Sequence, residues 1–220
     1  MGPSFPAIVG AGPNGAIVHY RPTEENHATC ENLLTPILID TGGHYLDGTT
    51  DTTRTLIFSE DYQQDETLAN LSEMYTRVLM GNLDLQLATF PAKRTMGSSI
   101  EALARRHLWE IGSDFSHGVG HGVSHCGPVH EYPHYAFAKS APYACPLDSG
   151  MIITNEPGFY KEGSYGIRIE NILHVCATEN HQNFLRFENM TMVPYCKELL
   201  ERQLLRDEHK NEILEYYEQI

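Results

Sequence analysis

Four carboxylates and one imidazole, widely separated along the chain, constrain this sequence more than any other feature. Asp40 ends an apolar run, Asp51 stands in a threonine-rich segment, and His121, Glu156 and Glu170 follow in three further short segments. Carboxylate oxygens with a single imidazole suit hard divalent cations. Two cations held close together can share a water, lower its pKa and direct it at a carbonyl carbon. A fold that uses all five residues must bring these segments to one point, so the chain is predicted to be a two-metal hydrolase.

Each of these residues also has an ordinary structural interpretation when it is taken alone. Asp40 and Asp51 could be turn residues at strand ends. Arg168 and Glu170 share one face of a predicted strand, opposite two isoleucines, and could form a surface ion pair. Glu156 precedes Pro-Gly in an apolar strand, where burial without a partner is costly. The joint occurrence of all five residues favours the metal site over these separate interpretations.

A histidine-rich segment contains His117, His121 and His125, spaced by four residues. On a helix this spacing would indicate a zinc site, but the three intervening glycines make a helix unfavourable here. The segment is therefore predicted to be a loop. His130 and His134 enrich it further, and neither His125 nor His134 is assigned a role.

The expected elements do not alternate regularly between strand and helix, which favours an α+β fold over a doubly wound sheet. A hairpin is expected over 6–21 with its turn at 12–15, and this assignment also rejects 10–15 as a dinucleotide fingerprint, which must open a helix. A capping box at Ser98 and Glu101 predicts where the second helix begins. Apolar periodicity predicts helices over about 65–89, 98–111 and 197–218. Further strands are predicted over 36–40, 52–58, about 150–155, 166–176 and 183–193.

Composition excludes several classes of function. The chain has 220 residues and a formal net charge of −14, which argues against nucleic acid and against anionic membrane surfaces as partners. Its length is that of one domain, 1–220. No apolar stretch approaches the length of a membrane span, and five widely spaced cysteines favour a reducing compartment. We therefore expect a cytoplasmic protein with no membrane partner.

The segments around these residues resemble a known family. The blocks that carry the resemblance are Phe5-Pro-Ala-Ile-Val-Gly-Ala-Gly-Pro-Asn-Gly, Ile39-Asp-Thr-Gly-Gly, Thr49-Thr-Asp-Thr-Thr-Arg, His117-Gly-Val-Gly-His, Thr154-Asn-Glu-Pro-Gly and Gly166-Ile-Arg-Ile-Glu-Asn. In this order they are similar to the catalytic domain of aminopeptidase P, the Xaa-Pro aminopeptidase of the M24 metallopeptidases. The resemblance implies the pita-bread fold, a curved antiparallel sheet with helices on its convex face. It also implies removal of an N-terminal residue that precedes proline, so the expected substrates are peptides with proline at the second position.

The resemblance further implies a role for each metal ligand. Asp51 and Glu170 would bridge two divalent cations, Asp40 would chelate one of them, and His121 with Glu156 would bind the other. The family implies Mn²⁺, although Zn²⁺ or Co²⁺ could occupy such a site. A metal-bridging hydroxide would attack the Xaa-Pro bond, with Glu156 shuttling the proton.

Four further residues match the family's groups around the substrate. His19, His117, His130 and Arg168 would bind substrate, and His117 and His130 would also steady the oxyanion as catalytic groups. Arg168 could instead be a plain ion-pair partner, and a supporting role that holds pocket tyrosines or Glu156 is preferred.

The resemblance has one gap and leaves two alternatives. The first pair of helices of the catalytic domain is expected to be missing, which would make the chain N-terminally truncated. Its bare sheet face would then be covered by self-association into a homo-oligomer or by the missing N-terminal segment. The alternatives are a prolidase-type dipeptidase and a non-catalytic pita-bread module that binds protein partners.

Overall fold

The structure, a computed structural model, describes residues 2–29, 34–59, 66–131 and 145–220. Within them every paired strand is antiparallel to its neighbour, and helices and strands do not alternate, so the predicted α+β class is confirmed. The strands are β1 (Gly2–Pro3), β2 (Ile8–Ala11), β3 (Ile37–Thr41), β4 (Gly43–Tyr45), β5 (Gly48–Thr49), β6 (Thr52–Leu56), β7 (Phe90–Pro91), β8 (Ile152–Asn155), β9 (Gly158–Lys161), β10 (Tyr165–Arg168), β11 (Asn171–Ala177) and β12 (Phe184–Asn189). They pair in the orders β2-β3-β6, β1-β4-β5, β9-β10 and β7-β12-β11-β8.

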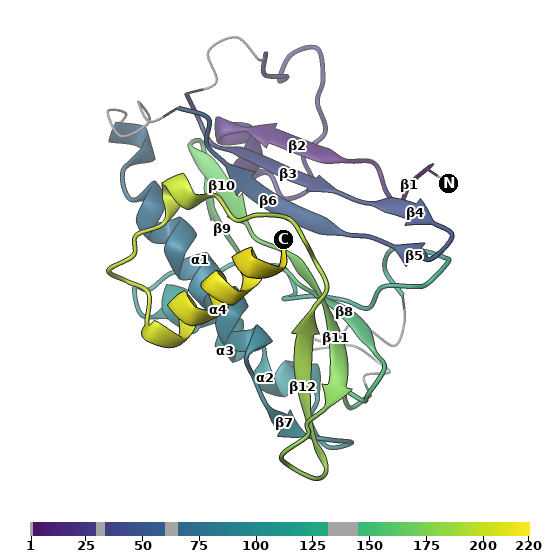
Figure 1. Cartoon of the computed structure of the whole chain (residues 1–220). Helices are drawn as coiled ribbons and strands as arrows, with labels where there is room; N and C mark the ends of the chain where they lie inside the picture. The colour runs from purple at the N-terminus through teal and green to yellow at the C-terminus, as the bar shows by residue number, and fades with distance from the viewer. Residues whose placement is uncertain (1, 30–33, 60–65, 132–144) are drawn as a thin grey trace.

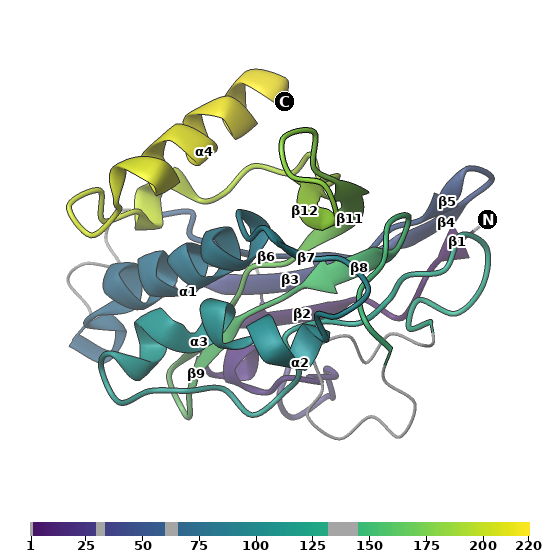
Figure 2. The same ribbon diagram turned by 90° about the horizontal axis from the view of Figure 1, so that it is seen from below.

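The helices gather on one side of the molecule, while the small β1-β4-β5 sheet extends away from them (Figures 1 and 2). They are α1 (Leu71–Gln86), α2 (Gly97–Ile100), α3 (Ala102–Trp109) and α4 (Asp207–Gln219), with 3-10 turns η1 (Gly12–Ala16), η3 (Glu66–Leu68) and η4 (Lys197–Leu199). In the described part of the chain, none of these helices combines the length and the apolar character that crossing a bilayer requires.

The longest helix, α1, forms the centre of the hydrophobic core. Leu71, Tyr75, Val78 and Leu79 recur at intervals of three and four, and all four are buried, as the periodicity predicts. They pack with inward-facing residues of β10, β11 and β12 in one apolar cluster. The helix begins later than predicted because Asn70 takes a left-handed conformation, with φ of 66°, which separates α1 from the preceding 3-10 turn.

The other two predicted helices are shorter than their sequence patterns indicate. The predicted helix 98–111 divides into α2 and α3 at Glu101, and α2 has no side-chain cap, so the predicted capping box is wrong. Glu101 is instead buried beside Arg105 at 3.8 Å. At the C-terminus the helix begins only at Asp207, ten residues later than the pattern predicts.

The predicted hairpin over 6–21 is also wrong. Only β2 forms, and the segment after it folds into η1 and turns. The physical reason is a tertiary contact: η1 packs against β10 so closely that a Cβ atom on Gly166 would lie 1.8 Å from the carbonyl oxygen of Gly15. A second strand here would not allow that approach between the two backbones.

A single strand predicted over 166–176 is interrupted at Ile169 and Glu170, which separate β10 from β11. The interruption has a cause outside this segment. The amide of Glu170 donates to the carbonyl of Thr53 on β6, and the buried guanidinium of Arg54 donates to the carbonyl of Glu170 at 2.6 Å. These contacts join β6 to the chain at Glu170, between β10 and β11.

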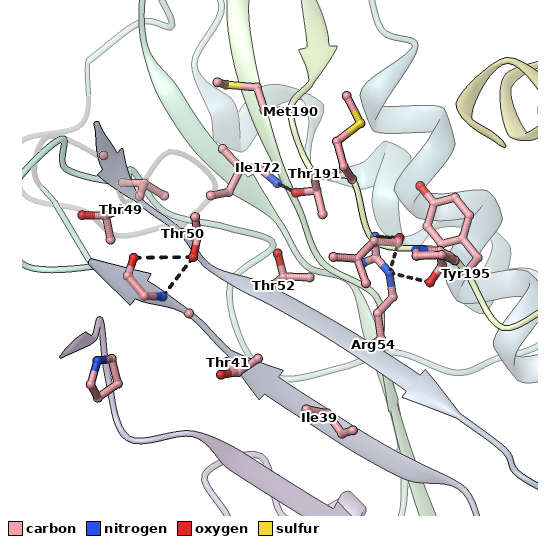
Figure 3. A pocket seen from close by; sticks show the side chains of 18 of the residues that line it. Ile39, Thr41, Thr49, Thr50, Thr52, Arg54, Ile172, Met190, Thr191 and Tyr195 are labelled. Carbon is pink, nitrogen blue, oxygen red and sulfur yellow. Dashed lines mark hydrogen bonds between the residues drawn. The ribbon is translucent and has the colours of Figure 1, made fainter. Parts of the chain in front are cut away.

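One face of β3 and β6 borders a large open groove of about 1430 Å³ (Figure 3). Ile39, Thr52 and Arg54 line one side, and Ile172 with the segment 190–196 lines the other. Several large apolar side chains of this lining are exposed to solvent, namely Tyr45, Phe58, Met190, Met192 and Val193. In the described part of the chain no helix covers this groove.

Candidate metal centre

Two of the predicted ligands come from the antiparallel pair β3–β6. Asp40 lies opposite Thr53 in the register of this pair. Side chains two residues apart on a strand point to the same face, so Asp51, just before β6, lies on the same face as Thr53. This pairing places both aspartates at one side of the sheet, and both are buried.

Two further predicted ligands, Glu156 and Glu170, lie just beyond the ends of strands. Glu156 follows β8, and its amide donates to the carbonyl of Val119 at 2.7 Å. Glu170 lies between β10 and β11, is 2% exposed, and accepts a hydrogen bond of 2.6 Å from the hydroxyl of Thr53. Both glutamates therefore stand where the backbone has left regular pairing with its own sheet.

His121 lies in the glycine-rich loop that the sequence predicted. The amide of Thr154 donates to the carbonyl of His121, and the amide of His121 donates to the hydroxyl of Thr154. Gly120 permits this contact, because a Cβ atom there would lie 2.0 Å from the carbonyl oxygen of Thr154. The loop is thus fastened to β8, and Glu156 is only two residues further on.

The five predicted ligands meet at one pocket of about 1000 Å³. Nε2 of His121 lies 3.3 Å from Oδ2 of Asp51 and 3.5 Å from Oε1 of Glu156. One donor atom each from Asp51, His121 and Glu170 lies within 4.8 Å of the others. Asp40 lines the same pocket. Segments spread from residue 40 to residue 170 therefore converge as the sequence predicts.

The orientation of His121 fits a cation. Its Nδ1 lies 2.8 Å from the carbonyl oxygen of Gly122, which can only accept, so Nδ1 carries the proton. In the neutral ring Nε2 then presents a lone pair to the carboxylate oxygens of Asp51 and Glu156. Three lone-pair donors facing one another are stabilised by a positive ion between them, and a backbone carbonyl on the far nitrogen is the usual arrangement for a metal-binding histidine.

Asp40 gives the same indication. Its Oδ2 accepts a hydrogen bond of 2.6 Å from Arg168. Its Oδ1 is buried without a hydrogen-bond partner among the described residues. A buried carboxylate oxygen that lacks a donor is costly, and a divalent cation in the pocket would satisfy it. The residues present therefore fit two hard divalent cations.

Arg168 is not part of a surface ion pair. It is 3% exposed, and it contacts Asp40, the hydroxyl of Thr53 and the hydroxyl of Tyr160. Arg168 thus binds a tyrosine, as the preferred interpretation expects, and it also binds Asp40, while its part in the function stays a prediction. No hydrogen bond from Arg168 to Glu156 is found among the described residues.

Tyr160 links Arg168 to the first histidine of the loop. The guanidinium donates to the Tyr160 oxygen at 3.0 Å, and the tyrosine hydroxyl lies 2.8 Å from Nε2 of His117. Since Nδ1 of His117 lies 2.8 Å from the carbonyl of Gly118, Nε2 is the acceptor and Tyr160 donates to it. Burial lowers the pKa of His117 to about 4, so this ring is neutral at neutral pH.

His19 and His130 line the same pocket as the five ligands. His19 lies in a turn rather than in the predicted strand. The ring of His130 packs edge-on against that of His121, with centroids 4.1 Å apart. His125 lines the open groove on the other side of the molecule, and His134 lies outside the described residues.

Burial dominates the electrostatics of the centre. It raises the pKa of Glu156 to about 7, and it raises the pKa of Glu170 well above its ordinary value, reinforced by the charge of Asp51. Burial also raises the pKa of Asp40, although Arg168 opposes that shift. Burial lowers the pKa of His121, but its contacts with Asp51 and Glu156 outweigh this, so the net shift is upward.

These shifts predict how stability depends on pH when no metal is added. A carboxyl group whose pKa is raised by folding binds more protons in the folded state, so stability falls as the pH rises. The raised pKa of His121 acts in the same direction, whereas the lowered pKa of His117 opposes it below about pH 6.5. We expect the free energy of unfolding in EDTA to fall between pH 6.5 and 8.5, by up to about 1.4 kcal/mol per pH unit for each proton.

Urea unfolding at several pH values measures this dependence. Saturating Mn²⁺ should abolish the decrease, because the cations replace the protons. A chain that becomes more stable in EDTA over this interval would contradict the assignment of Glu156 and Glu170 to a crowded anionic centre.

Thr53 and Tyr160 are contacts of the centre that the sequence does not reveal. Thr53 stands two residues after Asp51, and that spacing on a strand is the one signal that could have identified it. Tyr160 becomes visible only when β9 pairs with β10, which sets Tyr160 opposite Gly166.

The family model for metallopeptidase family M24 matches residues 1–177, and the model for the C-terminal region of peptidase M24 matches residues 183–220. The probable Xaa-Pro aminopeptidase P of Botryotinia fuckeliana is 43% identical over 225 aligned residues, which cover 100% of this chain and 33% of that protein. The chain thus spans about a third of the length of the curated relatives that it matches.

Solved structures agree. The X-prolyl aminopeptidase of Caenorhabditis elegans, described as a cytosolic enzyme with a di-nuclear active site, superposes with a TM-score of 0.87 at 35% identity. The alignment covers 99% of this chain and 34% of that one. The Xaa-Pro dipeptidase of Bacillus anthracis has a TM-score of 0.68 at 30% identity, covering 88% of this chain and 48% of that one. These matches confirm the expected pita-bread fold.

Proposed function

The chain belongs to metallopeptidase family M24, and we propose that it forms the metal-dependent catalytic unit of an Xaa-Pro aminopeptidase. Its substrates would be peptides with proline at the second position, from which it would release the N-terminal residue. The relatives named Xaa-Pro aminopeptidase support this substrate class, since they match the whole length of the chain.

One observation carries the proposal. Carboxylate oxygens of Asp51 and Glu156 lie within 3.5 Å of Nε2 of His121. Glu170 and Asp40 lie in the same pocket. A non-catalytic binding module would have no need to gather three buried carboxylates and the partly buried Glu156, since their desolvation is unfavourable without a compensating charge. The intact donor set therefore favours a hydrolase over the binding-module alternative.

In this proposal Asp51 and Glu170 would be shared between two cations, Asp40 would help to hold one of them, and His121 with Glu156 would hold the other. Mn²⁺ is the preferred ion because four carboxylates outnumber one imidazole, although Zn²⁺ and Co²⁺ suit the same donors. The bound ions supply a water of lowered pKa and Lewis acidity at the scissile carbonyl. Glu156 would take up the proton and pass it to the leaving nitrogen.

The remaining pocket residues would handle the peptide. His19, His117 and His130 would contact the substrate, and His117 and His130 would donate to the developing oxyanion. Because Nδ1 carries the proton of the neutral His117 ring and Nε2 accepts from Tyr160, the ring must turn Nδ1–H away from Gly118, or move its proton to Nε2, before His117 can donate to the oxyanion. Arg168 would bind no substrate directly and would hold Asp40 and Tyr160 in place, which departs from its predicted role in substrate binding.

The proposal is tested by assaying the Mn²⁺-loaded chain with an Xaa-Pro-Xaa tripeptide and with an Xaa-Pro dipeptide. Cleavage of the tripeptide supports an aminopeptidase. Cleavage of the dipeptide alone would favour the prolidase-type alternative, which the structural similarity to the Xaa-Pro dipeptidase of Bacillus anthracis supports. Failure to cleave either peptide with two ions bound would reject the function for this chain.

Replacing His130 with alanine should separate substrate contact from metal binding. We expect turnover of the tripeptide to fall at least tenfold while the Mn²⁺ content stays unchanged, because His130 packs against His121 without being a ligand. His125→Ala is the matched control, since this exposed histidine lies in the groove of the other face. Loss of metal in proportion to loss of activity would make His130 a ligand.

Two further parts of the proposal concern location and assembly. A cytoplasmic location goes with the description of the nematode relative as cytosolic. The apolar groove of β3 and β6 would be covered by a second copy of the chain, since Phe58, Met190 and Met192 of its lining are exposed, and exposed apolar patches often mark interaction surfaces. Light scattering that finds a stable monomer would reject the homo-oligomer.

A further inference from the structure

A buried amide on α1 lies behind both glutamates of the centre. Asn82 is fully buried, and its Nδ2 donates to the carbonyl of Asn155 at 2.8 Å and to the carbonyl of Ile169 at 3.0 Å. These two residues immediately precede Glu156 and Glu170. A single side chain from a helix thus binds the backbone directly before two ligands that come from different strands.

The contact fixes whole peptide units. The carbonyl of Asn155 and the amide of Glu156 belong to one planar peptide group, as do the carbonyl of Ile169 and the amide of Glu170. At the amide end the first group is bound to Val119 and the second to Thr53. At the carbonyl end both groups are bound to Asn82. Both planes are therefore held at both ends, and Asn82 is the part that the two share.

The remaining polar atom of Asn82 is also used. Its Oδ1 accepts a hydrogen bond of 3.3 Å from Asn171, the residue after Glu170, and Asn155 donates back to the Asn82 carbonyl at 2.8 Å. Every hydrogen-bonding group of the Asn82 side chain is thus directed at a residue adjacent to one of the two glutamates. Ordinary packing of a helix on a sheet requires no such arrangement, because an apolar side chain fills the same place.

From this geometry we propose that Asn82 is a positioning residue, which sets the separation of the Glu156 and Glu170 carboxylates. That separation determines how tightly the centre binds the second of its two cations once the first is bound. The inference rests on the proposed function only in requiring a metal centre, not in requiring peptide cleavage. Asn82 touches neither a cation nor the substrate and acts through the two peptide groups alone. Partners of this kind behind metal ligands commonly change metal affinity by about 10- to 100-fold.

The test compares Asn82→Leu, which keeps the size and removes the amide, with Asn82→Ser, which keeps one hydroxyl donor. Gln86→Leu is the matched control. Gln86 is buried one turn further along the same helix and belongs to the same amide cluster through Asn171, but it contacts neither carbonyl. Thermal unfolding in EDTA reports the general structural damage in each variant.

Two readouts are independent of turnover. Calorimetric titration with Mn²⁺ should show binding weakened by about 10- to 100-fold in Asn82→Leu and less in Asn82→Ser. Electron paramagnetic resonance of the loaded protein should show the signal of two coupled Mn²⁺ ions in the wild type and in Gln86→Leu. In both Asn82 variants it should show mainly isolated Mn²⁺ at the same loading.

The outcomes separate the inference from the function. If Asn82→Leu does not fold, Asn82→Ser carries the test with the same readouts. Wild-type affinity and coupling in a folded Asn82 variant would overturn the inference, and so would an equal loss of affinity in Gln86→Leu. Coupled ions in a wild type that cleaves no peptide would leave the inference standing and reject the function. A wild type that binds no Mn²⁺ would overturn both.

Discussion

Replacing Glu156 with glutamine is expected to lower the turnover of an Xaa-Pro-Xaa peptide at least about 10²-fold, the lower end of what general acid–base catalysis contributes. Glutamine keeps the size of the side chain and the hydrogen bond that Thr154 donates to Oε1 at 3.2 Å. It removes both the proton acceptor and one anionic ligand. The expected loss therefore combines slower proton transfer with weaker binding of the cation next to His121.

Glu131→Gln is the matched control, since this exposed carboxylate lines the same pocket and is not one of the five ligands. Turnover must be measured at saturating Mn²⁺, with the metal content determined in the same sample. Glu156 would have no place in the mechanism if the fully loaded Gln variant turned over near the wild-type rate.

Replacing Arg168 with methionine is expected to have the largest effect on stability. The guanidinium is 3% exposed and binds Asp40, Thr53 and Tyr160. Removing one partner of a buried ion pair leaves the other charge uncompensated, which typically costs about 3–5 kcal/mol. Total stabilities are about 5–15 kcal/mol, so this single substitution removes a large part of the free energy of unfolding.

Urea unfolding in EDTA measures this loss, and Arg186→Met is the control. Arg186 pairs with Glu188 on the exposed surface of β12, where such pairs contribute about 0–1 kcal/mol. Adding Mn²⁺ should restore part of the stability of Arg168→Met, because the cation compensates Asp40. If both variants lost the same free energy of unfolding, the buried pair would stabilise the fold no more than the exposed pair does.

The sequence indicated which polar side chains come together in one pocket, because residues of the metal-ligand type have a chemistry of their own. Charge within strand-like segments made Asp40, Asp51 and Glu170 recognisable. The glycines around His121 excluded a helix, and with it a zinc site made of His117, His121 and His125. All five line one pocket. Their individual roles toward the cations remain predictions.

The sequence predicted the supporting contacts poorly, because these depend on pairs of residues that meet only in the folded chain. Nothing in the periodicity of α1 distinguishes Asn82 from any other polar position on a helix. The close approach of Gly15 to Gly166 replaced an expected hairpin with a 3-10 turn. The contact of Arg54 with Glu170 interrupted a strand that local propensity would continue. Local pattern identified the elements, and long-range contacts decided where they end.

The measurement that tests the central claim most directly is the number of Mn²⁺ ions bound per chain, determined by calorimetric titration and checked by elemental analysis. If Asp40, Asp51, His121, Glu156 and Glu170 form one centre, the wild type should bind two ions. Asp51→Asn, which changes one proposed bridging ligand, should bind one or none. A wild type that binds no Mn²⁺, or an Asp51→Asn variant that still binds two with unchanged affinity, would contradict the dinuclear centre proposed for this chain.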